Sequence, residues 1–206
     1  MAAPASSLSV FQLADQWFDQ ARTALQGSLP CRHGCSACCI GPFPITQLDV
    51  LELQRGLSLL PLEQRRAIEN RAAGQVNEIE RAYPALRTQP TLDQWKDEAI
   101  DRLTARFGDR PCPALQADGS CAVYAFRPIT CRMTGIPTET EGLVQGACSV
   151  QTAVPVVRVP ERLRQQEDAI AEREAEALAV LLHIRPAGGE EVLLPYGFLP
   201  DRTTSR

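Results

Sequence analysis

The stretch Cys31-Arg32-His33-Gly34-Cys35-Ser36-Ala37-Cys38-Cys39 decides how the rest of the chain is interpreted, because it places four thiols within nine residues. In a Cys-x2-Cys pair such as Cys35/Cys38, two thiolates can reach one ion at about 2.3 Å from each sulfur, as in zinc knuckles. Eight thiols in all are enough for two four-thiolate sites, or for one cluster with cysteines to spare. We therefore expect a soft metal to be bound, with these candidate ligands: Cys31, Cys35, Cys38, Cys39, Cys112, Cys121, Cys131 and Cys148.

Length and composition indicate a soluble globular protein. The 206 residues suit a single domain, 1–206, and the apolar and charged fractions, 44% and 22%, are ordinary. A net charge of -4 offers no electrostatic attraction to phosphates, so we expect no nucleic-acid partner.

The ends and apolar runs of the sequence bear on the compartment. The N-terminal residues MAAPASSLSVF lack the basic and apolar regions of a secretory signal, and the longest apolar run, 177–184, is too short to span a bilayer. We therefore expect a cytoplasmic protein without a membrane partner. Thiols in the cytosol stay reduced, so a dense cysteine pattern there indicates a metal site or catalysis more often than disulfides, which are the alternative.

Helical periodicity covers most of the chain outside the cysteine segments. Apolar residues recur at helical spacing over 8–26, and Thr46 with Asp49 resembles a helix start. Further helices are expected after Pro61, from a Thr91 cap, and as a charged C-terminal helix at 161–184. The helix after Pro61 presents one apolar face, made by Ile68, Ala72, Val76, Ile79 and Tyr83.

The remaining segments predict little regular structure. Residues 112–124 are typical of a short β-hairpin turning at Asp118-Gly119, 126–160 look irregular, and 191–198 predict a strand. The expected fold is mainly α with a small β-hairpin (α+β), a helical scaffold around an irregular cysteine-rich metal-binding core at 31–150.

Strand parity constrains two of the ligands. A two-residue turn at Asp118-Gly119 would pair Cys112 near residue 125, roughly 13 Å along the strand from Cys121 at ~3.3 Å per residue. That is too far for one ion. Either the two thiols serve different metals, or Pro113 bends the chain, and we favour the bend.

Basic residues beside the cysteines are candidate partners of the thiolates. Four thiolates on Zn²⁺ leave a net charge of about -2, which hydrogen bonds from neighbouring cations would offset. The candidates are Arg32, His33, Arg127 and Arg132, and the alternative for the arginines is a solvated surface position, which Arg32 favours more than Arg127 and Arg132 do. His33 is also an alternative ligand, although the cysteines alone suffice.

Enzyme templates find little support. Cys31-x3-Cys35-x2-Cys38 matches the three-cysteine spacing of radical SAM enzymes, but those cysteines follow a first strand, whereas helices are expected on both sides here. The chain has no GxSxG, Walker A or GxGxxG motif, and its two histidines, His33 and His183, do not support a triad or an HExxH site. No catalytic residue is assigned.

Taken together, the motifs resemble the CxxCxxCC family of zinc- or iron-chelating domain proteins, often called YkgJ-like. The resemblance spans about 31–148, and only Cys31 departs from it, since three residues rather than two separate it from Cys35. The motifs that carry it are Cys35-Ser36-Ala37-Cys38-Cys39, Phe43-Pro44-Ile45-Thr46 leading to Asp49, Cys112-Pro113-x-Leu115, Gly119-x-Cys121-x-Val123-Tyr124, Arg127-Pro128, Cys131-Arg132 and Cys148.

The resemblance implies a protein that binds zinc or iron, an iron–sulfur cluster included, through its cysteine thiolates. Some family members resemble flagellin lysine N-methyltransferases, so the alternative hypothesis is an iron–sulfur-dependent protein-modifying enzyme. A third hypothesis is a metal-stabilised interaction module with the helix at 161–183 as partner surface.

Overall fold

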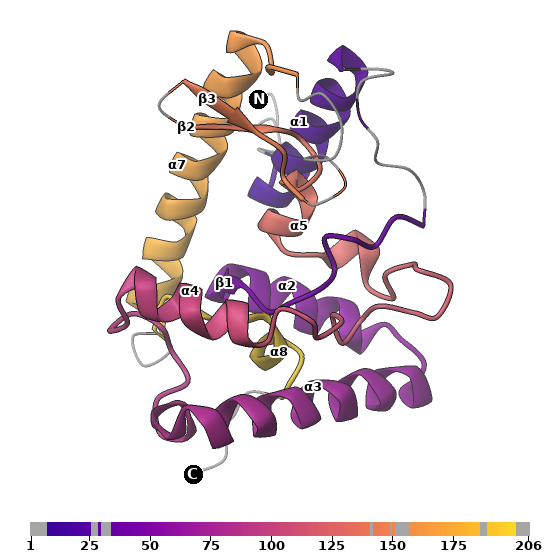
Figure 1. The fold of residues 1–206 in the computed structure, drawn as a ribbon, viewed down its shortest axis with the longest axis vertical. Coiled ribbons are helices and arrows are strands. Elements are labelled where there is room, and N and C mark those ends of the chain that lie inside the picture. The colour runs from indigo at the N-terminus through magenta and orange to yellow at the C-terminus, as the bar shows by residue number, and fades with distance from the viewer. Residues whose placement is uncertain are drawn as a thin grey trace, which may run out of the picture. The chain divides into compact units, whose positions relative to one another are not determined.

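The computed structural model describes residues 8–25, 29, 34–140, 142–148, 150, 157–185 and 189–200. Over these residues, helices predominate and the strands form short antiparallel pairs (Figure 1), which confirms the expected mainly α class. The chain divides into two compact units, a first unit with residues 1–32 and 129–176 and a second unit with residues 33–128 and 177–206. Each unit has its own hydrophobic core. A single domain over 1–206 stays a prediction.

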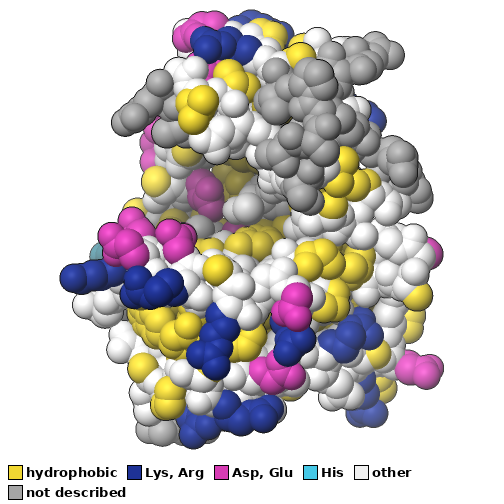
Figure 2. Space-filling view, in the orientation of Figure 1, with side chains coloured by type: hydrophobic (Ala, Val, Ile, Leu, Met, Phe, Trp, Pro, Cys, Tyr) yellow, Lys and Arg dark blue, Asp and Glu magenta, His cyan; other side chains and the backbone are white. Residues whose placement is uncertain are grey.

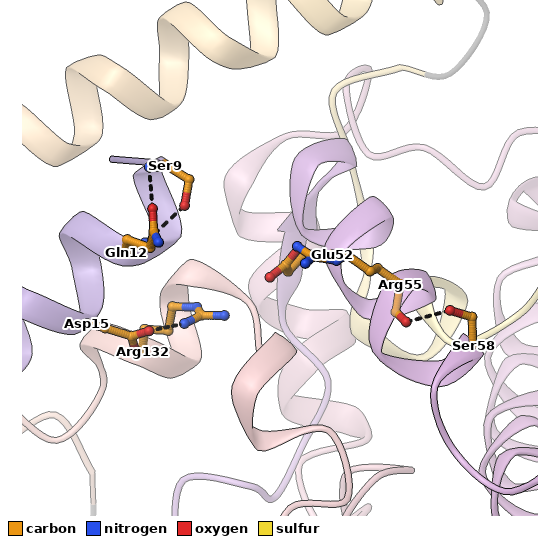
Figure 3. A network of polar contacts seen from close by, with 7 residues as sticks. All are labelled: Ser9, Gln12, Asp15, Glu52, Arg55, Ser58 and Arg132. Carbon is orange, nitrogen blue, oxygen red and sulfur yellow. Dashed lines mark hydrogen bonds and ion pairs between the residues drawn. The ribbon is translucent and has the colours of Figure 1, made fainter. Parts of the chain in front are cut away.

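The first unit is built on α1, which begins with a capping box. The Gln12 N–H donates to the Ser9 Oγ, and the Ser9 N–H donates to the Gln12 Oε1 (Figure 3), so two N–H groups of the first helical turn are satisfied. The helix expected at 8–26 is thereby confirmed with slightly shorter bounds. The elements of this unit are α1 (Val10–Ala24), α5 (Ile129–Met133), β2 (Thr138–Thr140), β3 (Leu143–Gln145) and the part of α7 (Glu161–Ile184) up to Glu176.

The core of the first unit joins α1 to α7. Ala14, Trp17 and Ala21 of α1 are buried together with Leu163 and Ile170 of α7. The Trp17 indole Nε1 donates to the Leu163 carbonyl at 2.7 Å, which satisfies the one polar atom of that side chain inside the core. Segment 126–160, expected to be irregular, contains α5 and the antiparallel β2–β3 hairpin instead.

The second unit places a two-stranded sheet beside helices. Strand β1 pairs antiparallel with β4, Ile45 opposite Val192, and α8 lies against α2 and α3 (Figure 1). The elements are β1 (Pro44–Thr46), α2 (Gln47–Ser58), α3 (Leu62–Ala82), η1 (Pro84–Arg87), α4 (Asp97–Arg106), η2 (Tyr124–Phe126), the end of α7, β4 (Glu191–Leu193) and α8 (Leu194–Gly197).

Two helices of the second unit begin where the sequence predicts. A capping box starts α2: the Asp49 N–H donates to the Thr46 Oγ1 at 3.4 Å, and the Thr46 N–H donates to Asp49 Oδ2 at 3.2 Å. Pro61 is the N-cap of α3, whose expected apolar face is buried against the core. Sequence-local signals therefore suffice for these elements.

Two boundaries differ from the prediction, one because of distant residues and one because of a nearby proline. Helix α4 begins at Asp97 and not at Thr91, since Thr91 forms a β-bridge with Val192 and the Leu92 N–H donates to the Glu191 carbonyl at 2.9 Å. The strand expected at 191–198 ends at Leu193, where α8 follows with a proline in its first turn.

The face of the molecule over α3 and α4 is mixed in charge. Figure 2 shows Lys and Arg side chains interspersed with acidic and apolar ones over α3 and α4, in line with the net charge of -4. None of the described helices is long and apolar enough to cross a membrane.

Candidate metal centre

Two cysteine segments of the second unit, 34–41 and 110–122, lie side by side. Ile40 forms a β-bridge with Pro111, the Cys112 N–H donates to the Cys39 carbonyl at 2.8 Å, and the Gly41 N–H donates to the Arg110 carbonyl at 2.6 Å. These backbone bonds bring the N-terminal cysteine loop next to a cysteine far along the sequence.

The two segments also meet at a pair of glycines. Gly119 has φ +82°, and a Cβ added to it would lie 2.8 Å from the Gly34 carbonyl oxygen, so only glycine permits this approach. The turn before it is held by Asp118, whose Oδ1 accepts from the Ser120 N–H at 2.9 Å and from the Ser120 Oγ at 2.7 Å. The turn is thereby fixed against the residue that precedes Cys35.

The predicted hairpin at 112–124 is only partly correct. A single bridge joins Leu115 and Cys121, one residue away from the expected register, and no strand forms. The Gly119 N–H donates to the Gln116 carbonyl and the Gln116 N–H to the Ser120 carbonyl, at 3.0 and 2.8 Å. These bonds enclose a three-residue loop with a left-handed glycine, which shifts the register relative to the two-residue turn.

The chain turns at Cys112, as expected from a bend at Pro113. The Leu115 N–H donates to the Cys112 carbonyl at 3.0 Å, so the residues around Pro113 do not continue as a strand. Burial raises the pKa of the Cys112 thiol to about 11, and the nearby charge of Cys121 acts in the same direction. Because the Cys112 thiol lies within electrostatic reach of Cys121, we take the two residues as one thiol pair.

Hydrogen-bond donors are directed at the sulfurs of this pair. The backbone N–H groups of Ala114 and Leu115 lower the pKa of Cys112 against the effect of burial, and the backbone of Val123 does the same for Cys121, whose pKa burial raises. Backbone donors of this kind stabilise the thiolate, which is the form that binds metal.

Arg127 is placed as the sequence suggested. Its positive charge lowers the pKa of Cys121 against the effect of burial. The Arg127 Nη1 donates to the Tyr124 carbonyl at 2.9 Å, and the guanidinium carbon lies 4.1 Å from the centre of the Tyr124 ring. A cation is therefore held close to one of the thiols.

Cys38 and Cys39 form a second thiol pair. The hydrogen bond with Cys39, followed by burial and the charge of Cys39, raises the pKa of Cys38 well above its ordinary value. The Cys39 N–H donates to the Ser36 carbonyl at 2.9 Å, which closes a tight turn. Cys38 is exposed and Cys39 half-buried, so this pair lies at the surface of the second unit.

The remaining predicted residues are distributed as follows. Cys35 is half-buried and belongs to the second unit, whereas Cys131 on α5 and Cys148 after β3 belong to the first unit. Cys31, His33 and Arg32 lie outside the described residues. None of the cysteines that the structure describes forms a disulfide.

Arg132, expected beside a thiolate, has partners in the core of the first unit. Its side chain is 2% exposed, and its Nη1 forms an ion pair with the Asp15 carboxylate of α1 (Figure 3). Its guanidinium carbon also lies 5.2 Å from the centre of the Phe11 ring. These contacts fasten α5 to α1.

The thiols of the second unit fit zinc or iron in their chemistry. Sulfur donors suit Zn²⁺ and iron–sulfur clusters. When both thiols of a pair lose their protons, the two thiolates carry like charges, which a bound cation would neutralise. Among the described residues, His, Cys, Asp and Glu do not gather in threes that could hold one ion. The structure therefore supplies two thiol pairs, joined through the bond from Cys112 to Cys39.

Sequence reasoning missed two residues of α3 that contact the cysteine segment. The Arg71 Nε donates to the Pro113 carbonyl at 2.8 Å, and the Gln75 Nε2 donates to the Pro111 carbonyl at 2.7 Å. The pattern of α3 predicts only its buried face, so the spacing of four residues between Arg71 and Gln75 was the sole available signal.

Comparison with known proteins agrees with the donor chemistry. The family model named CxxCxxCC, described as a putative zinc- or iron-chelating domain, matches residues 30–149, more than half of the chain and all eight cysteines. No curated protein and no solved structure matches the chain. By this match, the chain belongs to the CxxCxxCC family of zinc- or iron-chelating domains.

Proposed function

We propose that this protein chelates zinc or iron through clustered cysteine thiolates, with the two thiol pairs of the second unit at the centre of the site. The observation that carries the proposal is the 2.8 Å bond from the Cys112 N–H to the Cys39 carbonyl, which brings the pairs together. The family match to residues 30–149 supports the same function.

The residues that would hold the metal in the second unit are Cys35, Cys38, Cys39, Cys112 and Cys121. The raised pKa values of Cys38, Cys112 and Cys121 mean that these three thiols are protonated at neutral pH when no metal is bound. A bound cation would supply the positive charge that makes the thiolates stable side by side. Cys31, Cys131 and Cys148 remain proposed ligands, and His33 an alternative one.

The metal bound by these cysteines is either zinc or iron. An all-sulfur donor set suits Zn²⁺ and iron–sulfur clusters alike, and we propose that either is held in the reducing cytosol. Elemental analysis and an absorption spectrum of anaerobically purified protein separate the two. Stoichiometric zinc gives a colourless protein, whereas a cluster gives a brown protein with charge-transfer absorption. A protein that contains no stoichiometric metal and keeps its fold in chelator would contradict the proposal.

Substitution of single residues tests the proposed ligands. Cys38→Ser and Cys112→Ser are each expected to lose stoichiometric metal, because each removes one member of a thiol pair. Ser36→Ala, in the same loop, is the matched control and is expected to keep its metal. Circular dichroism shows whether the helices of each variant remain intact. If both cysteine variants retain full metal, these pairs are not the site.

A further inference from the structure

Every polar backbone group of the segment Pro111–Pro113 has a hydrogen-bond partner. Neither proline carries an N–H, so the segment has one donor and three acceptors. The Cys112 N–H donates to the Cys39 carbonyl at 2.8 Å, and the Cys112 carbonyl accepts from the Leu115 N–H at 3.0 Å. The two proline carbonyls are left, and side chains of α3 bind both of them.

The two donors on α3 are spaced to match the segment. The Gln75 Nε2 lies 2.7 Å from the Pro111 carbonyl, and the Arg71 Nε lies 2.8 Å from the Pro113 carbonyl. Residues four apart on a helix lie on one face, separated by ~6 Å along its axis, so the two side chains can reach two carbonyls on either side of one residue. Both bonds therefore form together, with Cys112 between them.

Helix α3 is itself anchored independently of the thiols. Its apolar residues Ile68, Ala72 and Val76 are buried in the core of the second unit. One turn further along, Glu78 forms an ion pair with Arg110 at 3.0 Å, so the contact continues beyond the prolines. The hydrogen bonds from Arg71 and Gln75 thereby fix the backbone around Cys112 to a helix whose own position depends on apolar packing.

Arg71 also places a positive charge beside the cysteine segment. Its Nε donates to the Pro113 carbonyl at 2.8 Å, so the guanidinium is fixed next to the residue that follows Cys112. Since thiolate-only sites carry excess negative charge, a cation fixed by its own hydrogen bond to the neighbouring carbonyl favours the metal-bound form.

We propose that Arg71 and Gln75 are positioning residues for the metal ligand Cys112, which hold its backbone between two proline carbonyls, with Arg71 adding a fixed positive charge. This inference rests on the proposed function, in which Cys112 binds the metal. Residues that orient ligands in this way typically change metal affinity by about 10- to 100-fold when they are removed.

The test compares Arg71→Met and Gln75→Met with wild-type full-length protein in zinc competition against a chromophoric chelator. Each variant is expected to bind zinc about 10- to 100-fold more weakly. Arg71→Lys keeps the charge and a donor, so it should recover much of the loss. The matched control is Arg81→Met, because Arg81 lies on the same helix and its Nε donates to the Asn77 carbonyl of that helix at 3.1 Å.

Two further readouts separate positioning from overall stability. At saturating Co²⁺, the thiolate-to-cobalt charge-transfer band should change in Arg71→Met and Gln75→Met and stay unchanged in Arg81→Met. In metal-free protein, amide hydrogen exchange at Cys112 should accelerate in the first two variants, because each removes the hydrogen bond to one neighbouring residue. That residue is Pro113 in Arg71→Met and Pro111 in Gln75→Met.

The outcomes distinguish this inference from the proposed function. If wild type binds zinc and both variants bind it as tightly as Arg81→Met, with an unchanged cobalt spectrum, Arg71 and Gln75 do not position the ligand and the proposed function stands. If wild type binds neither zinc nor cobalt, the proposed function fails and the inference with it. Should Arg71→Met lose its helical circular dichroism, Gln75→Met and Arg71→Lys decide the outcome.

Discussion

Cys112 and Cys131 are both half-buried, and each has an arginine near it, but different interactions hold the chain around them. Cys112 lies in an irregular segment that backbone bonds and the side chains of α3 hold. Cys131 lies on α5, where buried Ile129 and the Arg132–Asp15 ion pair fix the helix to α1. The position of Cys131 therefore follows from core packing, whereas that of Cys112 depends on polar contacts that a metal would reinforce.

Removal of the metal should affect the two regions most unequally, and this is the largest effect that we expect. Metal-binding free energy adds directly to the stability of the segments that supply the ligands. In chelator, hydrogen exchange should accelerate by orders of magnitude at 34–41 and 110–122 and far less in α1 and α5, because core packing holds α5 whether or not Cys131 also binds metal. Mass spectrometry of proteolytic fragments measures both. Equal loss of protection in α5 would break the comparison and show that Cys131 also depends on metal.

Asp15→Asn should produce the opposite pattern, since it removes the carboxylate that pairs with the Arg132 guanidinium, which is 2% exposed. Because the Asp15 side chain is itself 42% exposed, we expect a cost of about 2 kcal/mol in the free energy of unfolding, as for a hydrogen bond between charged groups. Urea unfolding followed by circular dichroism measures the loss, and metal content should stay unchanged.

The control for that change is Asp19→Asn on the same helix. Asp19 pairs with Arg22 at 3.2 Å, but both side chains are about two-thirds exposed, 69% and 66%. An exposed pair of this kind contributes less than about 1 kcal/mol. If the two substitutions cost the same, Arg132 does not depend on its ion pair with Asp15.

Two glycines with the same backbone conformation sharpen the comparison at the level of single atoms. Gly119 and Gly142 have φ +82° and +79°, but an added Cβ would meet the Gly34 carbonyl at the first and open space at the second. Gly142→Ala should cost about 1 kcal/mol for the left-handed conformation alone, and Gly119→Ala at least about 2 kcal/mol. Gly119→Ala should also weaken zinc binding, because it separates the two cysteine segments. Chemical unfolding and zinc competition measure these effects, and equal costs at both sites would contradict the close approach.

The smallest effect concerns Glu191, in the second unit on β4. Burial, followed by the charges of Asp93, Glu190 and other carboxylates, raises its pKa. When folding raises the pKa of a carboxyl group, the folded protein loses stability as the pH rises from the ordinary pKa of that group through the raised one. Glu191→Gln should therefore stabilise the protein slightly at pH 7 and have no effect near pH 4. Urea unfolding at both pH values measures this, and an equal change at both would contradict it.

The sequence predicts those parts of the fold that depend on neighbours along the chain. The Thr46 capping box and the apolar face of α3 are encoded locally, and both are found as predicted. The start of α4 is not predictable in this way, because the competing β-bridge of Thr91 is made with Val192, a residue far away along the sequence. Patterns of neighbouring residues do not reveal a hydrogen-bonding partner that approaches only when the chain folds.

The candidate site shows the same division. The cysteines are recognisable by residue type and spacing, and the family match covers all of them. Their pairing is not recognisable, since the register of Leu115 and Cys121 depends on a three-residue turn with Gly119. Arg71 and Gln75 lie on a polar helix face, where the same residue types are normally just solvated, so their role is visible only in the structure.

The indole bond between Trp17 and the Leu163 carbonyl also has a spectroscopic consequence. The chain has two tryptophans, Trp17 in the first unit and Trp95 in the second, where Trp95 lies 5.8 Å from the Tyr83 ring. Each unit thus carries its own fluorophore. In Trp95→Phe protein, the emission reports on the first unit alone, and in Trp17→Phe protein on the second. The unfolding of each unit can then be followed separately by intrinsic fluorescence, without any added label.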